Sequence, residues 1–380
     1  MKHLLNILDL SKEEIGELIT TAEDIEARPE QYREACKYKI LATLFFEPST
    51  RTRLSFESAM LSLGGNVVSM AGANASSAAK GESVADTAEV VSGYVDIIAM
   101  RHPKEGAPYV AANHSSVPVI NAGDGGHYHP TQTLADLLTL HREKGAFENL
   151  TVGFCGDLKY GRTVHSLIAA LSRYRGVKFV LISPEELRLP EFVKRDYIEE
   201  KNVAYTESTS LEEQIGKLDA LYMTRVQKER FESEAEYERL KDTYILTEEK
   251  MRLAGKNTVI LHPLPRVNEI SVKVDEDPRA CYFKQTRNGK LMRMALILKL
   301  LKEKETAERG GACKQKNAEA DKRNTFVSLS AKCKNPHCIC VSEQELSPLF
   351  YRDKRGTICC AYCDAAAGGE TAAGGETAAE

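Results

Sequence analysis

Short apolar runs alternate with amphipathic stretches over about the first 300 residues of the chain. Three runs, at residues 41–46 (LATLFF), 95–101 (VDIIAMR) and 178–184 (KFVLISP), have the length and composition of buried β-strands. After the first of them, residues 53–65 (RLSFESAMLSLGG) place apolar side chains near helical spacing and end in a glycine pair that stops a helix. Strand–helix alternation of this kind predicts parallel sheets covered by helices.

The same alternation continues to about residue 303. Residues 150–157 (LTVGFCGD), 220–226 (ALYMTRV) and 258–265 (TVILHPLP) are further predicted strands. Residues 133–145 (TLADLLTLHREKG) join two sheets, and the amphipathic stretch 291–303 (LMRMALILKLLKE) closes the unit. We therefore predict an α/β protein with two parallel-sheet, three-layer domains.

The C-terminal part of the chain has a different composition. It begins with a polar stretch that contains a Gly-Gly pair, which predicts a linker, and it ends in a GGETAA repeat without core-forming side chains, which predicts disorder. Six cysteines between them predict a small metal-binding β domain. The predicted boundaries are 1–132 with 288–303 for the first domain, 133–287 for the second, 304–324 for the linker, 325–364 for the small domain and 365–380 for the disordered tail.

Composition narrows the class of protein. The 380 residues exceed what one core usually spans, and 42% hydrophobic with 28% charged residues indicates a soluble globular protein. A net charge of -4 gives no electrostatic reason to expect nucleic acid. The N-terminus lacks the pattern of a signal peptide, and no apolar run has membrane-spanning length, so we expect a cytoplasmic protein without a membrane partner.

A cluster of hydroxyl and guanidinium groups follows the first predicted strand. Ser49, Thr50, Arg51 and Thr52 lie where that strand ends and a helix begins. Backbone N–H groups, hydroxyls and the positive end of the helix dipole meet at such a point, and Arg51 adds a permanent charge, so the stretch predicts an anion site. An ordinary Ser/Thr helix cap with surface arginines explains this stretch equally well when it is taken alone.

A glycine-rich turn, GDGGHYHPTQT, precedes the joining helix. His129 opens that helix, where the dipole disfavours the protonated imidazole, so a neutral donor that could polarise a carbonyl is expected. A histidine that only caps the helix is the simpler explanation of this motif alone. His127 lies within the turn and has weaker support.

Two further motifs place arginines after predicted strands. The segment GDLKYGRTVHS (156–166) nearly matches a phosphate loop, but Arg162 replaces the lysine and suits a carboxylate instead. Arg225 and Gln227 in YMTRVQKER are two residues apart, and the prolines of LHPLPR force an extended backbone in which one X-Pro bond could be cis. Because all these motifs fall at the carboxyl ends of parallel strands, they predict one ligand site for a phosphorylated substrate and a dicarboxylate.

Taken together, the motifs resemble those of the aspartate carbamoyltransferase catalytic chain. The segments FFEPSTRTRLSFE, MRHPKEGA, NAGDGGHYHPTQTLADL, GDLKYGRTVHSL, YMTRVQKER and LHPLPRVNEI occur in the family's order over about residues 1–303. The S-T-R-T and H-P-x-Q motifs also mark ornithine carbamoyltransferases, but YMTRVQKER and HPLPR favour aspartate as the acceptor. The resemblance implies that the first domain binds carbamoyl phosphate and that the second binds L-aspartate.

The resemblance also implies a role for each candidate residue. Residues expected to hold the phosphate or polarise the carbonyl of carbamoyl phosphate are Ser49, Thr50, Arg51, Thr52, Arg101 and His129. Those expected to hold the carbamoyl amide are Gln132 and the backbone carbonyl of Leu264. Those expected to bind the carboxylates of aspartate are Arg162, Arg225 and Gln227.

Other matched residues concern assembly. Ser76 and Lys80 correspond to residues that reach into the neighbouring subunit's site, which implies a homotrimer with shared active sites. Glu47, with Arg162 and Arg230, resembles a bridge between the two catalytic domains. In the implied reaction the amine of aspartate attacks the carbamoyl carbon, charge develops on the carbonyl oxygen near Arg51, Arg101 and His129, and the leaving phosphate takes the amine proton. The chemistry itself implies no metal.

The cysteine spacing near the C-terminus predicts a zinc site. CKNPHC gives C-x4-C and CAYC gives C-x2-C, two close pairs 21 residues apart, which is typical of tetrahedral zinc. The predicted ligands are Cys333, Cys338, Cys360 and Cys363. Cys340 and Cys359 are extra, a register that uses Cys359 is an alternative, and His337 is a weaker candidate.

This segment resembles the zinc domain of the aspartate carbamoyltransferase regulatory chain. In that family the domain docks on the catalytic chain and links catalytic trimers, so we expect the module to act between chains and to allow a dimer of trimers. The regulatory chain's nucleotide-binding domain has no counterpart here, so the resemblance does not imply control by CTP or ATP. No apolar strand is expected after Cys363.

Three other hypotheses remain open at this point. An ornithine-type acceptor keeps the fold and changes the amine, although Arg225 and Gln227 argue against it. A nucleic-acid-binding zinc ribbon would need a dense basic stripe with aromatic residues, which the tail lacks. A non-enzymatic protein would require Arg51, His129 and Arg162 to be structural, which the co-occurrence of six motifs makes remote.

Overall fold

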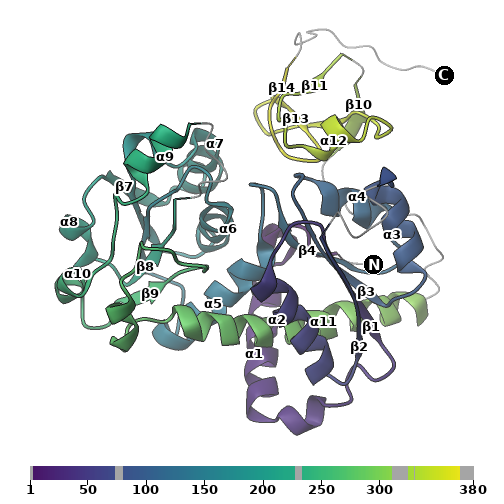
Figure 1. Ribbon diagram of the computed structural model, residues 1–380, viewed down its shortest axis with the longest axis horizontal. Coiled ribbons are helices and arrows are strands. Elements are labelled where there is room, and N and C mark those ends of the chain that lie inside the picture. Colours follow the sequence, from purple (N-terminus) through teal and green to yellow (C-terminus); the bar gives the residue numbers. More distant parts are fainter. Residues whose placement is uncertain (1–2, 73–79, 227–232, 310–323, 329, 369–380) are drawn as a thin grey trace.

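The computed structural model describes residues 3–72, 80–226, 233–309, 324–328 and 330–368. Two parallel sheets, each covered by helices, lie side by side, and a small antiparallel module sits above the first of them (Figure 1). The chain runs through these units in the order that the alternation of strands and helices predicts.

The first sheet has four parallel strands in the order β2-β1-β3-β4. The two faces of this sheet belong to different cores, because neighbouring side chains of a strand point to opposite sides. Leu41 and Ile97 pack with α1, α2 and α11, whereas Ala42 and Ile98 pack with α3 and α4. The elements are η1 (Ile7–Asp9), α1 (Lys12–Ala27), η2 (Pro29–Tyr32), β1 (Ile40–Phe45), α2 (Thr50–Ser62), β2 (Asn66–Ala71), α3 (Val84–Ser92), β3 (Ile97–His102), α4 (Ala107–His114) and β4 (Val119–Asp124).

The second sheet has five parallel strands in the order β7-β6-β5-β8-β9. Its strands β5, β6, β8 and β9 are almost entirely buried, as expected of a parallel sheet with both faces covered. The elements are β5 (Thr151–Cys155), α6 (Arg162–Leu171), β6 (Lys178–Ile182), η5 (Glu185–Leu187), α7 (Glu191–Val193), η6 (Lys194–Glu199), β7 (Ala204–Ser208), α8 (Glu212–Ile215), β8 (Ala220–Met223), α9 (Glu234–Leu240), α10 (Glu248–Leu253), β9 (Val259–Leu261) and η8 (Val272–Glu276).

Two long helices connect the sheets. The helix α5 (Pro130–Lys144) leads from the first sheet to the second, and α11 (Tyr282–Arg309) returns and packs along α5, α1 and α2 (Figure 1). Its apolar residues, including Met292 and Leu296, join the core shared with both sheets. The two sheets are thereby fastened to a common pair of helices.

The C-terminal module is a small antiparallel unit. Strands β10 (Thr325–Val327), β12 (Leu349–Arg352) and β13 (Ile358–Cys360) form one sheet, and β11 (Lys332–Cys333) pairs with β14 (Ala367–Gly368). A single helical turn, α12 (Ile339–Ser342), follows Cys338. The module thus has the β architecture expected from its sequence.

The structure corrects several details of the sequence prediction. The strands predicted around residues 41–46, 95–101, 150–157, 178–184, 220–226 and 258–265 are present as β1, β3, β5, β6, β8 and β9. The closing helix is longer than predicted and extends through Arg309 into the expected linker. Ala367 and Gly368 of the expected disordered tail form β14, because backbone pairing with β11 needs no apolar side chain. Residues 310–323 and 369–380 lie outside the described residues.

The module contacts the first domain of its own chain. The backbone of Glu105 pairs with the segment 337–339, its N–H donating to His337 O at 2.9 Å and its carbonyl accepting from Ile339 N at 2.9 Å. Tyr362 packs edge-on against Tyr109, with ring centroids 5.6 Å apart. Docking between chains therefore stays a prediction, whereas docking within the chain is observed.

An ionic contact extends this interface to the turn before α5. Asp364 accepts from Tyr128 Oη at 3.0 Å and lies 3.1 Å from His127 Nε2. The other ring nitrogen of His127 lies 3.1 Å from Asp124. Burial alone would lower the pKa of His127, but the two carboxylates outweigh it and raise the pKa to about 10. His127 is therefore a charged link between the module and the end of β4.

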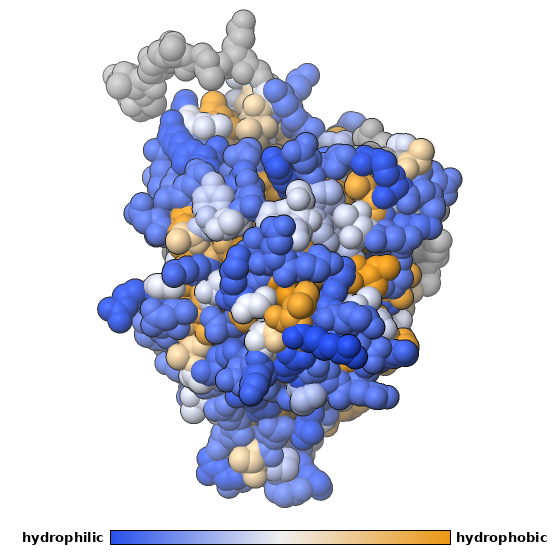
Figure 2. Space-filling model, turned by 90° about the vertical axis from the view of Figure 1, so that its left-hand side faces the viewer, coloured by the Kyte–Doolittle hydropathy of each residue, from blue (hydrophilic) through white to orange (hydrophobic). Residues whose placement is uncertain are grey.

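The side formed by the second domain is mostly hydrophilic and has only small hydrophobic areas (Figure 2). In the part of the chain that the structure describes, no helix combines the length and apolarity needed to cross a membrane.

Gly106 is the position at which one methyl group should disturb the docking of the module. Its φ of +83° disfavours other residues, and a Cβ there would lie 2.5 Å from Tyr362 O. We expect Gly106→Ala to lower the free energy of unfolding by about 1 kcal/mol because of the left-handed backbone. The clash with Tyr362 should lower it by about 1–3 kcal/mol more. Thermal unfolding and protease sensitivity of residues 324–368 would measure the two effects.

The matched control is Gly356→Ala. Gly356 has the same φ of +83°, but nothing lies within 4 Å of the position of its Cβ. In this control the free energy of unfolding should fall only by the cost of the left-handed backbone, about 1 kcal/mol. Equal destabilisation and equal protease sensitivity of the two variants would contradict the proposed clash.

Candidate active site

The first predicted anion-binding residues begin α2. Ser49 is the N-cap residue and has extended backbone angles (φ -158°, ψ 90°), but its side chain makes no capping hydrogen bond. The ordinary-cap explanation of this stretch therefore fails for Ser49. Thr50 and Arg51 are exposed in the first turn, and Thr52 is half-buried behind them. Arg51, Thr52 and Ser55 at the positive end of this 13-residue helix line a small cavity together with His262 and Pro263 of the second domain.

Three predicted residues converge on Gly123 at the end of β4. A Cβ at Gly123 would lie 2.9 Å from Arg101 Nη1, 3.3 Å from Arg162 Nη2 and 3.3 Å from His129 Cδ2. The glycine, with φ +117°, lets two guanidinium groups and an imidazole approach the backbone from different elements. Arg101 comes from β3, His129 precedes α5 and Arg162 begins α6. Residues distant in the sequence are thereby brought to one point.

A carboxylate balances this positive charge. Glu47, which follows β1, lies 2.7 Å from Arg101 Nη2 and 3.7 Å from Arg162 Nη2. Arg162 also donates to the carbonyl of Gly125. Glu47 therefore joins the first domain to the start of α6 in the second, as expected for the interdomain bridge. Arg230, the other predicted member of the bridge, lies outside the described residues.

His129 is held in its neutral form. Its side chain is buried, and the pKa is lowered well below the usual value, first by burial and then by the charges of Arg162 and Arg101. Its backbone N–H donates to Ser166 Oγ at 3.3 Å, and Nδ1 makes no hydrogen bond within the described part of the chain. A neutral imidazole in a cationic site can donate or accept one hydrogen bond without carrying charge.

Gln132 is fixed by a buried carboxylate. Its Nε2 donates to Asp136 Oδ1 at 2.8 Å, and Gln285 Nε2 donates to the same oxygen at 2.8 Å. Burial raises the pKa of Asp136 to about 7. A cavity of about 40 Å³ at this point is lined by Arg51, Thr52, Gln132 and their neighbours. The side chain of Gln132 is therefore held beside Arg51 and Thr52 at the start of α2.

Arg225 and Leu264 come to the site from the second domain. The charge of Arg225 contributes to lowering the pKa of Arg51, after burial, and also that of His262. Leu264 has φ +51° and is followed by a cis bond to Pro265, one of the X-Pro bonds predicted as candidates. Its N–H donates to His262 Nδ1 at 2.7 Å, and His262 Nε2 lies 2.7 Å from Glu269. These hydrogen bonds order the turn that carries Leu264.

The structure does not test three of the predicted site residues. Lys80 is exposed and lies before α3. Ser76 and Gln227 lie outside the described residues. An exposed Lys80 is expected if its partner site belongs to another subunit.

Sequence reasoning missed Arg293. This residue of α11 is buried, its Nη1 donates to Ser55 Oγ at 3.1 Å, and its guanidinium lies 5.1 Å from the centroid of Phe56. Its charge adds to the forces that lower the pKa of His129. A single arginine inside the apolar stretch 291–303 was the available signal, since a buried charge requires a partner.

The C-terminal cysteines form a candidate metal centre. The sulfur atoms of Cys333, Cys338, Cys360 and Cys363 lie within 4.8 Å of one another, and three of the four residues are buried. Four convergent thiol groups fit a tetrahedral metal ion. The alternative register is wrong: Cys359 pairs with Tyr351 and Cys360 with Phe350 in the β12–β13 ladder, so their side chains point to opposite faces. His337 is exposed.

Comparisons with known proteins agree with this architecture. Residues 2–142 match the carbamoyl-phosphate-binding domain of the aspartate/ornithine carbamoyltransferases, and residues 148–300 match their Asp/Orn-binding domain. Residues 327–372 match the metal-binding domain of the aspartate carbamoyltransferase regulatory chain.

Individual relatives cover the first two domains. The aspartate carbamoyltransferase catalytic subunit of Clostridium novyi (strain NT) is 60% identical over 300 residues, which are 79% of this chain and 98% of the relative. The catalytic subunit of Lachnoclostridium phytofermentans is 61% identical over 301 residues, 79% of this chain and 98% of the relative.

Solved structures show the same fold. The catalytic subunit of M. jannaschii aspartate transcarbamoylase superposes with a TM-score of 0.75 at 50% identity and covers 80% of this chain and 99% of its own. The Trypanosoma cruzi aspartate transcarbamoylase in complex with carbamoyl phosphate and aspartate superposes with a TM-score of 0.75 at 38% identity. It covers 79% of this chain and 96% of its own. The chain therefore belongs to the aspartate/ornithine carbamoyltransferase family and carries in addition a domain of the regulatory-chain metal-binding type.

Proposed function

We propose that this chain is an aspartate carbamoyltransferase. It transfers the carbamoyl group of carbamoyl phosphate to the α-amine of L-aspartate and yields N-carbamoyl-L-aspartate and phosphate, a step of de novo pyrimidine biosynthesis. The observation that carries the proposal is the convergence of Arg101, Arg162 and neutral His129 on Gly123, beside the open start of α2. The close relatives are named as aspartate enzymes, so ornithine as the acceptor is not favoured.

Carbamoyl phosphate occupies the side of the site formed by the first domain. Ser49, Thr50, Arg51 and Thr52 hold its phosphate, because a helix start with hydroxyls and a guanidinium complements a dianion. Gln132, oriented by Asp136, accepts from the carbamoyl amide together with the carbonyl of Leu264. These contacts place the carbamoyl carbon between the two domains.

Aspartate enters from the second domain. Arg162, Arg225 and Gln227 bind its two carboxylates, and its amine attacks the carbamoyl carbon. Negative charge then develops on the carbonyl oxygen, where Arg51, Arg101 and His129 are hydrogen-bond donors. The phosphate leaves into the α2 cradle and accepts the amine proton. Positioning of two bound substrates supplies much of the remaining acceleration.

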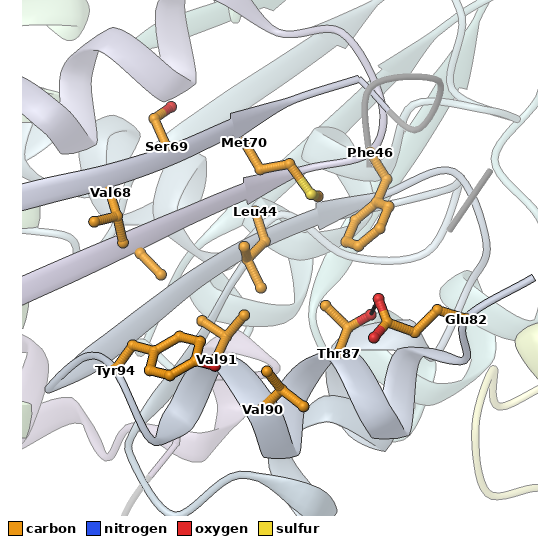
Figure 3. A pocket seen from close by; sticks show the side chains of 11 residues that line it. Leu44, Phe46, Val68, Ser69, Met70, Glu82, Thr87, Val90, Val91 and Tyr94 are labelled. Carbon is orange, nitrogen blue, oxygen red and sulfur yellow. Dashed lines mark hydrogen bonds between the residues drawn. The ribbon is translucent and has the colours of Figure 1, made fainter. Parts of the chain in front are cut away.

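The active unit is a homotrimer with shared sites. A groove of about 460 Å³ lies between the β2–β1 side of the first sheet and α3, and apolar side chains such as Leu44, Met70 and Val91 line it (Figure 3). At its rim Val68 is 47% and Tyr94 is 70% exposed, which leaves apolar surface for a second copy to cover. The groove also reaches Glu82, two residues beyond Lys80.

The cysteine centre is a structural zinc site. Four thiolates in a buried cluster suit zinc, and Zn²⁺ bound there would hold β11, α12 and β13 together. The module is fused to the catalytic part, and contacts between modules of different trimers would give a dimer of trimers. Described cysteines outside the module, Cys36, Cys155 and Cys281, are free thiols, which suits a reducing cytoplasm.

Substrate specificity tests the proposed activity. With carbamoyl phosphate and L-aspartate, the purified chain should form carbamoyl aspartate and phosphate in equal amounts. With L-ornithine in place of aspartate, the rate should fall to background, because Arg162 and Arg225 have no second carboxylate to bind. Faster formation of citrulline than of carbamoyl aspartate would contradict the proposal.

Loss of His129 should slow the reaction rather than substrate binding. We expect His129→Ala to lower kcat about 10²–10³-fold with a smaller change in KM, because a donor to the developing oxyanion is lost. The control is His114→Ala, since His114 is exposed at the end of α4. Steady-state kinetics of both variants test this expectation. An unchanged kcat for His129→Ala would contradict the role of His129 as a donor to the oxyanion.

Mixed trimers test whether the sites are shared. Lys80→Ala and His129→Ala chains should each be nearly inactive, because they lose opposite sides of one site. After dissociation and reassembly of an equal mixture, about one quarter of the sites contain neither substitution, so that share of wild-type activity should return. Activity that stays at the sum of the two parents would show that Lys80 serves its own chain or none.

A further inference from the structure

A fifth thiol lies against the candidate metal centre. The sulfur of Cys340 is 3.3 Å from that of Cys338 and 3.8 Å from that of Cys360. Cys340 is half-buried, whereas Cys338 is fully buried at the residue that caps α12. Tetrahedral zinc takes four protein ligands, so one thiol is in excess.

The sulfur separations indicate which thiols compete. With Zn–S bonds of about 2.3 Å, two ligands of one tetrahedral ion lie about 3.8 Å apart. The Cys338–Cys360 separation is 3.9 Å and the Cys340–Cys360 separation is 3.8 Å, so either residue suits an edge shared with Cys360. The 3.3 Å between Cys338 and Cys340 places both thiols at the same corner of the cluster, and zinc takes only four of the five thiols. These two residues therefore fit as alternatives at one corner and not as a pair of simultaneous ligands.

The backbone brings both thiols to the same corner. Cys338 has an extended conformation (φ -72°, ψ 144°) and Cys340 lies in the helical turn that begins one residue later. The remaining ligands come from other elements: Cys333 is in β11, Cys360 is in β13, and Cys333 and Cys363 are 3.5 Å apart. The four sulfur atoms that lie within 4.8 Å of one another include Cys338 but not Cys340, so Cys340 would have to shift toward the ion when it replaces Cys338.

We propose that Cys340 is an alternative ligand of the metal. Cys333, Cys360 and Cys363 bind it permanently, and either Cys338 or Cys340 completes the tetrahedron. This inference rests on the proposed identity of the metal as zinc. Its consequence is that the centre tolerates the loss of one specific thiol, whereas loss of any permanent ligand releases the metal.

Serine variants of the full-length chain test this inference. Zinc per chain is measured after gel filtration, and the absorption of the Co²⁺-substituted protein reports the number of thiolate ligands. Wild type, Cys338→Ser and Cys340→Ser should each retain about one zinc with four thiolates. Cys363→Ser and the double variant Cys338→Ser/Cys340→Ser should retain at least about tenfold less zinc under the same conditions.

Cys359→Ser is the matched control, because Cys359 neighbours a ligand but points to the opposite face of β13. It should keep wild-type zinc. Formation of carbamoyl aspartate shows that each variant has folded catalytic domains, and the Co²⁺ spectrum of Cys340→Ser gives a second reading if Cys338→Ser is insoluble.

The outcomes separate this inference from the zinc proposal. If wild type binds zinc but Cys338→Ser loses it as Cys363→Ser does, Cys340 is not a ligand and the inference fails alone. Full zinc retention by the double variant overturns it as well. If wild type binds no zinc while it forms carbamoyl aspartate, both the zinc site and the inference fall, and the catalytic proposal is unaffected.

Discussion

The catalytic centre depends on the ion pairs that Glu47 makes with Arg101 and Arg162. Two guanidinium groups, from Arg101 and Arg162, approach the same glycine, and their mutual repulsion would separate the elements that carry them. Glu47 lies within 4 Å of both and belongs to the loop between β1 and α2. One carboxylate therefore keeps the cationic groups together and also links the first domain to the start of α6 in the second. A charge in such a partly buried position stabilises only while both partners are present.

The protonation state of His129 follows from this arrangement. Burial removes water from the ring and lowers the pKa of His129, and the positive charges of Arg162, Arg101 and Arg293 lower it further. Because burial and these charges disfavour imidazolium, the ring stays neutral and can polarise a carbonyl without becoming a proton source. Asp136 keeps Gln132 oriented by accepting its hydrogen bond. Burial raises the pKa of Asp136 to about 7, and the charge of Arg293 opposes part of that rise.

Much of this could be predicted from the sequence because the signals are local. Buried strands of parallel sheets are short and apolar, and chemistry-bearing residues follow them directly, so β1, β3 and β5 and the residues after them were predicted. The edge strands β2 and β7 escaped because most of their residues are exposed and do not form a buried apolar run. Arg293 escaped because its partners lie far away in sequence. The roles of the individual site residues remain predictions from resemblance.

The docking of the module could not be predicted, since it depends on backbone pairing at Glu105 and on one aspartate opposite His127. That docking has a consequence for how the module responds to dilution. A partner on a separate chain dissociates as its concentration falls, whereas a tethered domain meets its surface at an effective concentration set by the connection and not by the sample. Occupancy of the Glu105 surface should thus be a property of each single molecule, the same in a crowded cell and in a dilute solution.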